Sequence, residues 1–206
     1  MPDFTYEIRF GRQMGKIVCG VDEVGRGPLA GPVVTAAVIL ASDFPEALCA
    51  KIKDSKKMTP AAREKIVEPL KEHCLFSLAQ ASVEEIDQLN ILHATMLAMQ
   101  RAVEDLGAKI DVALIDGNRA PDIPCQAVPV VKGDGTSLSI AAASIIAKVH
   151  RDRLMASLAK DFPFYGWERN AGYGTAEHIQ ALKAHGATVH HRQSFAPVRE
   201  VLQKSA

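Results

Sequence analysis

Acidic residues follow two apolar runs of this sequence, and their carboxylates have the chemistry of metal ligands. Asp22 ends the run 16–22 and is followed by Glu23, and Asp116 ends the run 111–116. Ligand sites collect at strand ends along one edge of an open α/β sheet, so neighbouring parallel strands would bring these carboxylates together. Close carboxylates repel one another and need a cation, and an all-oxygen set favours Mg²⁺ or Mn²⁺ over zinc. The alternative is that they are ordinary turn residues.

A fourth acid, Asp134, again comes just after an apolar run, in the stretch VVKGDG of residues 130–135. A helix is expected to begin soon after it. On that helix Ser144, Lys148 and Asp152 are spaced by four residues and share one face. Lys148 and Asp152 also fit an ordinary helical ion pair.

The stretch Gly25-Arg26-Gly27 follows the first acid pair directly. Glycines allow a backbone to approach a ligand closely, and arginine supplies a forked donor for phosphate. A tight turn explains the glycines equally well, so it is the position beside the acids that indicates a ligand-binding loop.

Three further segments carry side chains suited to a polyanion or a nucleoside. Lys56 lies in the charged turn 54–57, and His191 lies in the basic stretch 190–192. Tyr173 stands between two glycines, where its ring can stack on a sugar or a base. The alternatives are a solvated turn, the end of a surface loop and a half-buried loop tyrosine, respectively.

The strands and helices that must position these residues can be predicted from the hydrophobic pattern and from helix-capping residues. We expect strands at residues 16–22, 33–40, 75–81, 111–116 and 127–131. Helices are predicted from Pro60 to about 73, from the capping box at 82–85 to Gly107, over 139–162 and over 175–185. Without an internal repeat or linker, one α/β domain is the economical interpretation.

The length, composition and charge of the chain exclude several classes of protein. The 206 residues are 48% hydrophobic and 23% charged, which excludes a disordered tail protein and a coiled coil. The net charge of zero argues against a wholly basic nucleic-acid binder. However, residues 1–131 hold 14 Lys and Arg against 18 Asp and Glu, whereas residues 132–206 hold 10 against 6 and five of the seven His. That asymmetry is compatible with a metal site facing a polyanion, or with chance on a solvated surface.

Nothing in the sequence indicates export or a membrane. The four Cys form no C-x-x-C pair, and the charged N-terminus lacks the apolar core of a signal peptide. The longest weakly polar run is short for a membrane span. We therefore expect a soluble, reduced, cytoplasmic protein.

The run GVDEVGRGPLAGPVV at residues 20–34 strongly resembles the N-terminal signature of ribonuclease HII. The resemblance continues, in family order, through residues 54–57, 87–103, 114–118, 130–134, 139–152, 162–178 and 190–195. It covers nearly the whole chain, roughly residues 16–198.

The resemblance implies a ribonuclease H-like fold, in which a mixed five-stranded sheet is flanked by helices and followed by a C-terminal helical extension. It implies one catalytic domain over residues 1–206, with an N-terminal extension of about residues 1–15 and a helical extension of about residues 160–206. The implied activity is endonucleolytic hydrolysis of the RNA strand of RNA–DNA hybrids. Incision 5′ of single ribonucleotides embedded in duplex DNA is implied as well, with 3′-hydroxyl and 5′-phosphate ends and a role in ribonucleotide removal.

The family's site residues map onto matching positions of this sequence. Its catalytic carboxylates correspond to Asp22, Glu23, Asp116 and Asp134. The first three are expected to ligate two Mn²⁺ or Mg²⁺ ions, and Asp134 is assigned to the second ion or its water shell. The glycine loop corresponds to Gly25, Arg26 and Gly27, and the substrate-sensing tyrosine to Tyr173. Lys56, Lys148 and His191 are expected phosphate contacts.

Rival interpretations fit less well. The sister ribonuclease HIII carries an extra N-terminal domain, whereas only about fifteen residues precede the first expected strand here. A non-catalytic hybrid-binding protein would not need the four acids, a transposase-type nuclease would need DNA-targeting domains, and no P-loop motif is present. We expect a monomer, and no protein partner can be read from the sequence.

Overall fold

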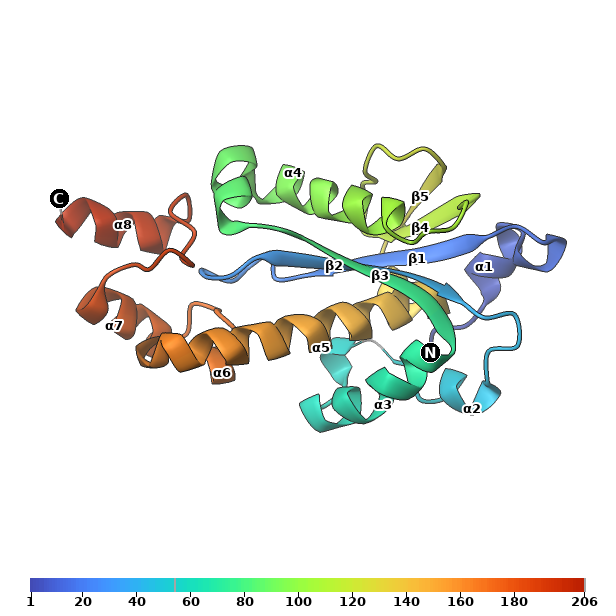
Figure 1. Ribbon diagram of the computed structural model, residues 1–206, viewed down its shortest axis with the longest axis horizontal. Coiled ribbons are helices and arrows are strands. Elements are labelled where there is room, and N and C mark those ends of the chain that lie inside the picture. The colour runs from blue at the N-terminus through green and yellow to red at the C-terminus, as the bar shows by residue number, and fades with distance from the viewer. Residues whose placement is uncertain (54, 206) are drawn as a thin grey trace.

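The central feature of the computed structural model, which describes residues 1–53 and 55–205, is one five-stranded sheet in the order β3-β2-β1-β4-β5 (Figure 1). Its strands are β1 (Val18–Val24), β2 (Val33–Leu40), β3 (Cys74–Ala81), β4 (Val112–Asp116) and β5 (Gln126–Val130). β1, β2 and β3 pair antiparallel, and β1, β4 and β5 pair parallel. The predicted mixed α/β sheet is therefore confirmed. Asp54, from the predicted charged turn, lies outside the described residues.

Helices cover both faces of this sheet, with α4 on one face and α3 and α5 on the other (Figure 1). The α-helices are α1 (Thr5–Arg9), α2 (Glu46–Cys49), α3 (Pro60–Glu72), α4 (Val83–Glu104), α5 (Leu138–Asp161), α6 (Trp167–Asn170), α7 (Ala176–His185) and α8 (Ala196–Ser205). Short 3-10 turns are η1 (Arg12–Met14), η2 (Ser55–Lys57), η3 (Gly133–Gly135) and η4 (Pro163–Tyr165). All the regular elements described after residue 161 are helical.

Capping residues start the helices where the sequence predicted them. Thr59 accepts a hydrogen bond from the amide of Ala62, with Pro60 in the first helical position. Ser82 and Glu85 form the predicted reciprocal capping box. These local interactions satisfy amide groups that have no partner within the helix.

One helix departs from its prediction. α4 is interrupted at Asn90, whose φ of 66° and ψ of 163° are not helical. The side-chain oxygen of Asn90 accepts hydrogen bonds from the amides of Leu92 (2.9 Å) and His93 (3.3 Å), so this residue caps a second helical segment. The side chain of His93 is exposed.

The two faces of the central strand β1 pack against different helices, because side chains alternate along a strand. Cys19 and Val21 belong to the core beneath α4. Gly20 faces α5, and a β-carbon at that position would lie 2.2 Å from the carbonyl carbon of Ser139 and 2.3 Å from the amide nitrogen of Ile140. The absence of a side chain at residue 20 therefore lets the α5 backbone rest directly on β1.

The N-terminal helix α1 is joined to the same region by a buried carboxylate. Glu7 is fully buried, and its Oε1 accepts hydrogen bonds from the amide of Ser139 (2.8 Å) and from the hydroxyls of Ser139 (2.6 Å) and Ser137 (2.7 Å). Because a negative charge stabilises a helix N-terminus, Glu7 fixes the start of α5.

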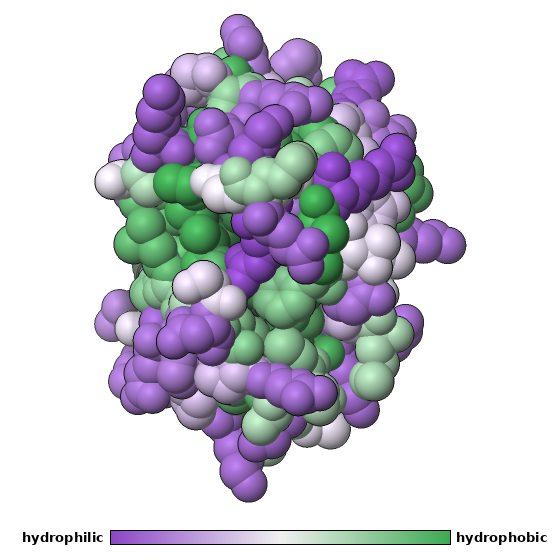
Figure 2. Space-filling model, turned by 90° about the vertical axis from the view of Figure 1, so that its right-hand side faces the viewer, coloured by the Kyte–Doolittle hydropathy of each residue, from purple (hydrophilic) through white to green (hydrophobic). Residues whose placement is uncertain are grey.

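The end of the molecule where α1 lies has a mixed surface. Figure 2 shows hydrophobic side chains there interrupted by hydrophilic ones. In the part of the chain that the structure describes, no helix combines the length and apolarity needed to span a bilayer.

Candidate active site

Asp22 and Asp116 lie side by side on the α5 face of the sheet. β1 and β4 are parallel neighbours, as predicted, with Val21 paired to Ile115, and each acid comes directly after one of these residues. Val21 and Ile115 face α4, so the alternation of side chains turns both acids toward α5. The sheet thus brings together two carboxylates that are far apart in the sequence.

Asp22 is held in place from both sides. It is 3% exposed, its Oδ1 accepts a hydrogen bond from the amide of Glu23 (2.7 Å), and its side chain is hydrogen-bonded to Ser144 on α5. The hydroxyl oxygens of Ser144 and Ser55 are 2.8 Å apart. A helix and a turn therefore fix the Asp22 carboxylate.

Asp134 reaches the same place from the turn η3, after β5. Asp116 Oδ1 accepts hydrogen bonds from the amides of Gly133 (2.7 Å) and Asp134 (3.4 Å), which ties the turn to the end of β4. Lys56 Nζ lies 3.7 Å from Asp134 Oδ2. Asp134 therefore lies beside Asp116 at the end of β4, and Lys56 lies close to Asp134.

Glu23 points to the other face of the sheet, as expected for a residue adjacent to Asp22. It shares a pocket of about 210 Å³ with Asp116 and with Met96 and Met99 of α4. Its Oε1 lies 3.4 Å from a guanidinium nitrogen of Arg26. The acids consequently line the sheet edge from both faces rather than forming one compact group.

Burial and mutual repulsion make the charges at this edge costly. Burial, followed by the charges of Glu23 and Asp116, raises the pKa of Asp22 well above its usual value. Burial also raises the pKa of Glu23, although the positive charge of Arg26 acts to lower it. Burial and the charge of Asp134 raise the pKa of Asp116. A cation is the natural means of lowering this electrostatic cost.

The donor set at this edge fits a hard divalent cation, because it consists of carboxylate oxygens. Among residues 1–53 and 55–205, no three Asp, Glu, His or Cys side chains are already gathered closely enough to hold an ion. Mg²⁺ is commonly bound by one or two carboxylates together with water and substrate phosphates rather than by a full protein cage. The open arrangement suits a site completed by its substrate.

The predicted glycine loop and tyrosine are neighbours beside the acids. Arg26 and Gly27 are exposed, and Arg26 extends back toward Glu23. A β-carbon at Gly27 would lie 3.5 Å from Cε1 of Tyr173, whose side chain is 45% exposed. The structure thus gathers two segments that are widely separated in the chain into one exposed surface.

Lys148 lies one helical turn beyond Ser144 on α5. Its Nζ is 2.7 Å from Asp152 Oδ1, and Arg63 approaches the other oxygen of Asp152 at 3.4 Å. The ordinary helical ion pair, which the sequence left open for Lys148 and Asp152, is therefore present.

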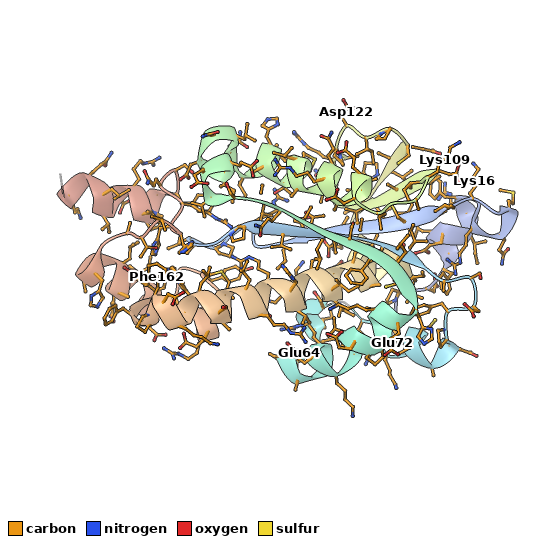
Figure 3. All side chains as sticks on the ribbon, viewed as in Figure 1. Lys16, Glu64, Glu72, Lys109, Asp122 and Phe162 are labelled. Carbon is orange, nitrogen blue, oxygen red and sulfur yellow. The ribbon has the colours of Figure 1, made fainter. Side chains whose placement is uncertain are left out.

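His191 is not where a phosphate contact requires it. Its side chain is 1% exposed and packs in an aromatic cluster with His178, Tyr165 and Trp167. Phe162, marked in Figure 3, adds a ring 5.6 Å from that of Trp167. The phosphate contact predicted for His191 is wrong, because the surrounding rings cover its imidazole.

Two buried histidines support the Tyr173 segment, and sequence reasoning missed this network. His178 Nδ1 donates to the carbonyl of Tyr173 (2.9 Å), so its Nε2 accepts from Trp167 Nε1 (3.2 Å) and from His191 Nε2 (3.1 Å). His191 Nδ1 accepts from the amide of Thr188 (2.9 Å). Every ring nitrogen has a role that requires both histidines to be neutral.

We expect this network to make the protein sensitive to acid. Burial lowers the pKa of His191 from 6.5 to about 3, together with repulsion from the positive charge that His178 and His190 carry when they are protonated. Between these pH values the unfolded state binds more protons than the folded state, so the free energy of unfolding falls as the pH is lowered. The slope is up to about 1.4 kcal/mol for each pH unit. Urea denaturation at several pH values measures it.

The H191Q variant isolates this contribution, because glutamine offers one acceptor and one donor without titrating. Relative to the wild type, H191Q should be less stable at pH 7.5 but lose less stability on acidification. H93Q, which changes an exposed histidine, serves as the matched control and should keep the wild-type slope. Equal slopes for H191Q and the wild type would contradict the expectation.

Comparison with known proteins agrees with this geometry. The family model described as ribonuclease HII matches residues 19–198. A ribonuclease HII from Rhodospirillum rubrum is 58% identical, with 100% of this chain and 94% of that protein covered. A ribonuclease HII from Paramagnetospirillum magneticum is 56% identical, with 98% and 99% covered.

Solved structures share the fold. Ribonuclease H2 from Pyrococcus horikoshii superposes with a TM-score of 0.76 at 26% identity, covering 91% of this chain and 97% of that one. Bst-RNase HIII, solved in complex with Mn²⁺, gives a TM-score of 0.76 at 19% identity, covering 95% and 72%. The predicted fold is thereby confirmed. From the family model and these relatives, the chain belongs to the ribonuclease HII family and is a metal-dependent ribonuclease that hydrolyses phosphodiester bonds.

Proposed function

We propose that this enzyme hydrolyses the RNA strand of RNA–DNA hybrids and also incises 5′ of single ribonucleotides embedded in duplex DNA. The products would carry a 3′-hydroxyl and a 5′-phosphate. The observation that carries the proposal is the exposed surface formed by Gly27 and Tyr173 directly beside the acids. Such a surface can examine a sugar while the acids act on the adjacent phosphate.

The four acids are assigned to the catalytic centre. Asp22, Glu23 and Asp116 would hold Mn²⁺ or Mg²⁺, with two ions per site, and Asp134 would serve the second ion or its water shell. When bound, the ions supply activation of water and neutralisation of charge at the phosphate. The protein's own contribution is orientation, because Ser144 holds Asp22 and the amide of Gly133 holds Asp116.

Recognition must rest on the 2′-hydroxyl, the group that separates RNA from DNA. We assign it to backbone groups of residues 25–27, including Gly25 and Arg26, with the Tyr173 ring packed on the sugar. Lys56, which is close to Asp134, is a suitable phosphate contact. Lys148 would contact phosphate only by sharing its ion pair with Asp152.

The wider setting is proposed on the same basis. Residues 1–206 would act as one catalytic unit, since Glu7 binds the start of α5 and Arg192 binds the loop after β1. The regions 1–15 and 160–206 would be its N-terminal and helical extensions. We propose a monomeric cytoplasmic enzyme that removes ribonucleotides from DNA.

Cleavage of duplex DNA bearing one ribonucleotide tests the function directly. The reaction is run in Mg²⁺, in Mn²⁺ and in EDTA, with both product ends mapped and an all-deoxy duplex as control. We expect cleavage 5′ of the ribonucleotide in the metal-containing reactions alone. Cleavage of the all-deoxy duplex at the same rate, or no cleavage of either duplex, would contradict the proposal.

Tyr173→Ala should reduce incision at a single ribonucleotide by roughly tenfold or more. Stacking of a base on an aromatic ring contributes about 1–3 kcal/mol, and we assign this ring a similar contact with the sugar. The melting temperature of the variant should change little, because the ring is half exposed. Tyr173→Phe separates the ring from the hydroxyl. Phe164→Ala removes another exposed aromatic ring and serves as the matched control. An unchanged rate for Tyr173→Ala would remove Tyr173 from recognition.

A further inference from the structure

Two arginines are completely buried behind the exposed loop of residues 25–27. Arg151 on α5 and Arg192 on the segment before α8 are each 0% exposed. The described residues offer neither guanidinium an ion-pair partner within 4 Å, and both bind backbone carbonyls instead. A buried guanidinium is expensive to desolvate, so its position calls for a specific reason.

Arg192 binds the loop itself. Its guanidinium donates to the carbonyls of Gly25 (2.5 Å), Arg26 (2.8 Å) and Gly31 (2.8 and 3.0 Å). All the donor nitrogens of this side chain are therefore used on one short stretch of backbone. The planar fork of arginine suits this task, whereas a lysine ammonium reproduces only part of it.

Arg151 connects that stretch to the segment that carries Tyr173. It donates to the carbonyls of Pro32 (3.0 Å), Ala30 (3.0 Å) and Ala171 (2.8 Å). The amide of Leu29 also donates to the carbonyl of Gly172 (2.8 Å). The loop and the tyrosine segment are thus held to each other by a buried cation.

Two glycines of this stretch, Gly25 and Gly31, lie against the buried side chain of Arg151. A β-carbon at Gly25, where φ is 93°, would lie 2.1 Å from Nε of Arg151. A β-carbon at Gly31, where φ is 82°, would lie 2.4 Å from the sulfur of Met155 and 3.3 Å from a terminal nitrogen of Arg151. The backbone conformation and the lack of space both require glycine at these positions.

The direction of the carbonyls determines the direction of the neighbouring amides. In a trans peptide the C=O and the following N–H point in opposite directions, and the described residues contain no cis peptide. The carbonyls of Gly25 and Arg26 point inward to Arg192, so the amides of Arg26 and Gly27 point outward. Arg26 and Gly27 are both exposed, which leaves two consecutive donors beside the Tyr173 ring.

We propose that Arg151 and Arg192 are positioning residues for substrate recognition, which orient the amides of Arg26 and Gly27 toward a ribose hydroxyl and set the Tyr173 ring next to them. This inference rests on the proposed function. Neither arginine touches the substrate, so each acts through the backbone it binds. Burial lowers the pKa of Arg151 to about 10 and that of Arg192 to about 9, and both therefore remain cationic at neutral pH.

The test compares two Arg→Lys variants at opposite ends of the molecule. R192K keeps the charge but loses the planar fork, whose three nitrogens make four hydrogen bonds to the carbonyls of Gly25, Arg26 and Gly31. R12K is the matched control, because Arg12 also donates to backbone carbonyls, those of Leu40 and Ala41. Arg12 lies close in sequence to Lys16, at the end of the molecule opposite Phe162 (Figure 3). Cleavage kinetics and melting temperature are measured for both variants and the wild type.

Discrimination between duplexes supplies the decisive measurement. Binding of a duplex with one ribonucleotide and of the all-deoxy duplex is followed by fluorescence anisotropy in EDTA. We expect R192K to lose the preference for the ribonucleotide and to raise KM about 10- to 100-fold, the size of effect that follows when the groups orienting metal ligands are replaced. R12K should keep the wild-type KM and preference even if its melting temperature falls as far as that of R192K.

A wild-type KM and preference in R192K would overturn the inference, as would an equal loss in R12K. If R192K does not fold, R151K is measured instead and must show the same loss. Failure of the wild type to cleave the ribonucleotide-containing duplex would refute the proposed function itself, which the wild-type reaction reveals separately.

Discussion

Replacing Asp116 with asparagine is expected to abolish metal-dependent cleavage without unfolding the protein. The asparagine side chain would keep an oxygen able to accept the hydrogen bond from the amide of Gly133, so the link between β4 and η3 would persist. What the substitution removes is a negative charge from the proposed metal site. Because carboxylates are the ligands that hard cations prefer, we expect the rate to fall by roughly three orders of magnitude or more.

The same substitution should leave stability equal to or greater than that of the wild type in EDTA. Burial and the charge of Asp134 raise the pKa of Asp116, which means that the folded state disfavours its charged form. Asparagine relieves this repulsion at neutral pH. A gain in stability that comes with a loss of activity is a known trade-off at functional sites.

Thermal denaturation and cleavage assays measure the two effects together. Asp122→Asn is the matched control, because Asp122 is exposed on the loop before β5 (Figure 3), and it should leave both quantities unchanged. Substrate binding in EDTA should survive in Asp116→Asn. Full cleavage by that variant would exclude Asp116 from the mechanism. A marked fall in its melting temperature would show that repulsion between Asp116 and Asp134 does not destabilise the wild type.

Gly20→Ala is expected to cause the largest loss of stability. Its β-carbon would lie 2.2 Å from a backbone carbon of Ser139 and 2.3 Å from the backbone nitrogen of Ile140, so no side-chain rotation relieves the clash. α5 must move away from β1, at a cost of about 3 kcal/mol or more. The same movement would separate Ser144 from Asp22, so activity should fall even in the fraction that folds.

Gly135→Ala provides the control for this prediction. Nothing lies within 4 Å of a β-carbon at residue 135, and its φ is outside the left-handed region. Urea denaturation should therefore give Gly135→Ala nearly wild-type stability. A Gly20→Ala variant that unfolds at the wild-type urea concentration would show that α5 can shift on the sheet at little cost.

The parts of the fold that could be predicted are those set by local sequence. Capping residues such as Thr59 and Ser82 defined helix starts, because their side chains bond amides three residues away. Acids at strand ends predicted the shared position of Asp22 and Asp116, because parallel neighbouring strands end at the same edge. The interruption at Asn90 was missed, since the apolar pattern continues through it.

The parts that could not be predicted depend on contacts between distant segments. His191 and Arg192 stand in a polar stretch typical of a surface loop, yet both are buried because the aromatic cluster and the loop after β1 enclose them. Nothing local distinguishes Arg151 from Arg153, one buried and one exposed on the same helix. The support of Tyr173 was invisible for the same reason.

Arg192 binds residues that lie far before it in the sequence, and this separation has a consequence for synthesis of the protein. A ribosome releases the chain from its N-terminus, so the four acids emerge well before the residue that fixes the carbonyls of Gly25 and Arg26. The sheet can pair and α5 can dock while the loop beside Tyr173 is still unrestrained. The nascent enzyme would therefore acquire its proposed catalytic groups first and its selectivity only after Arg192 has emerged.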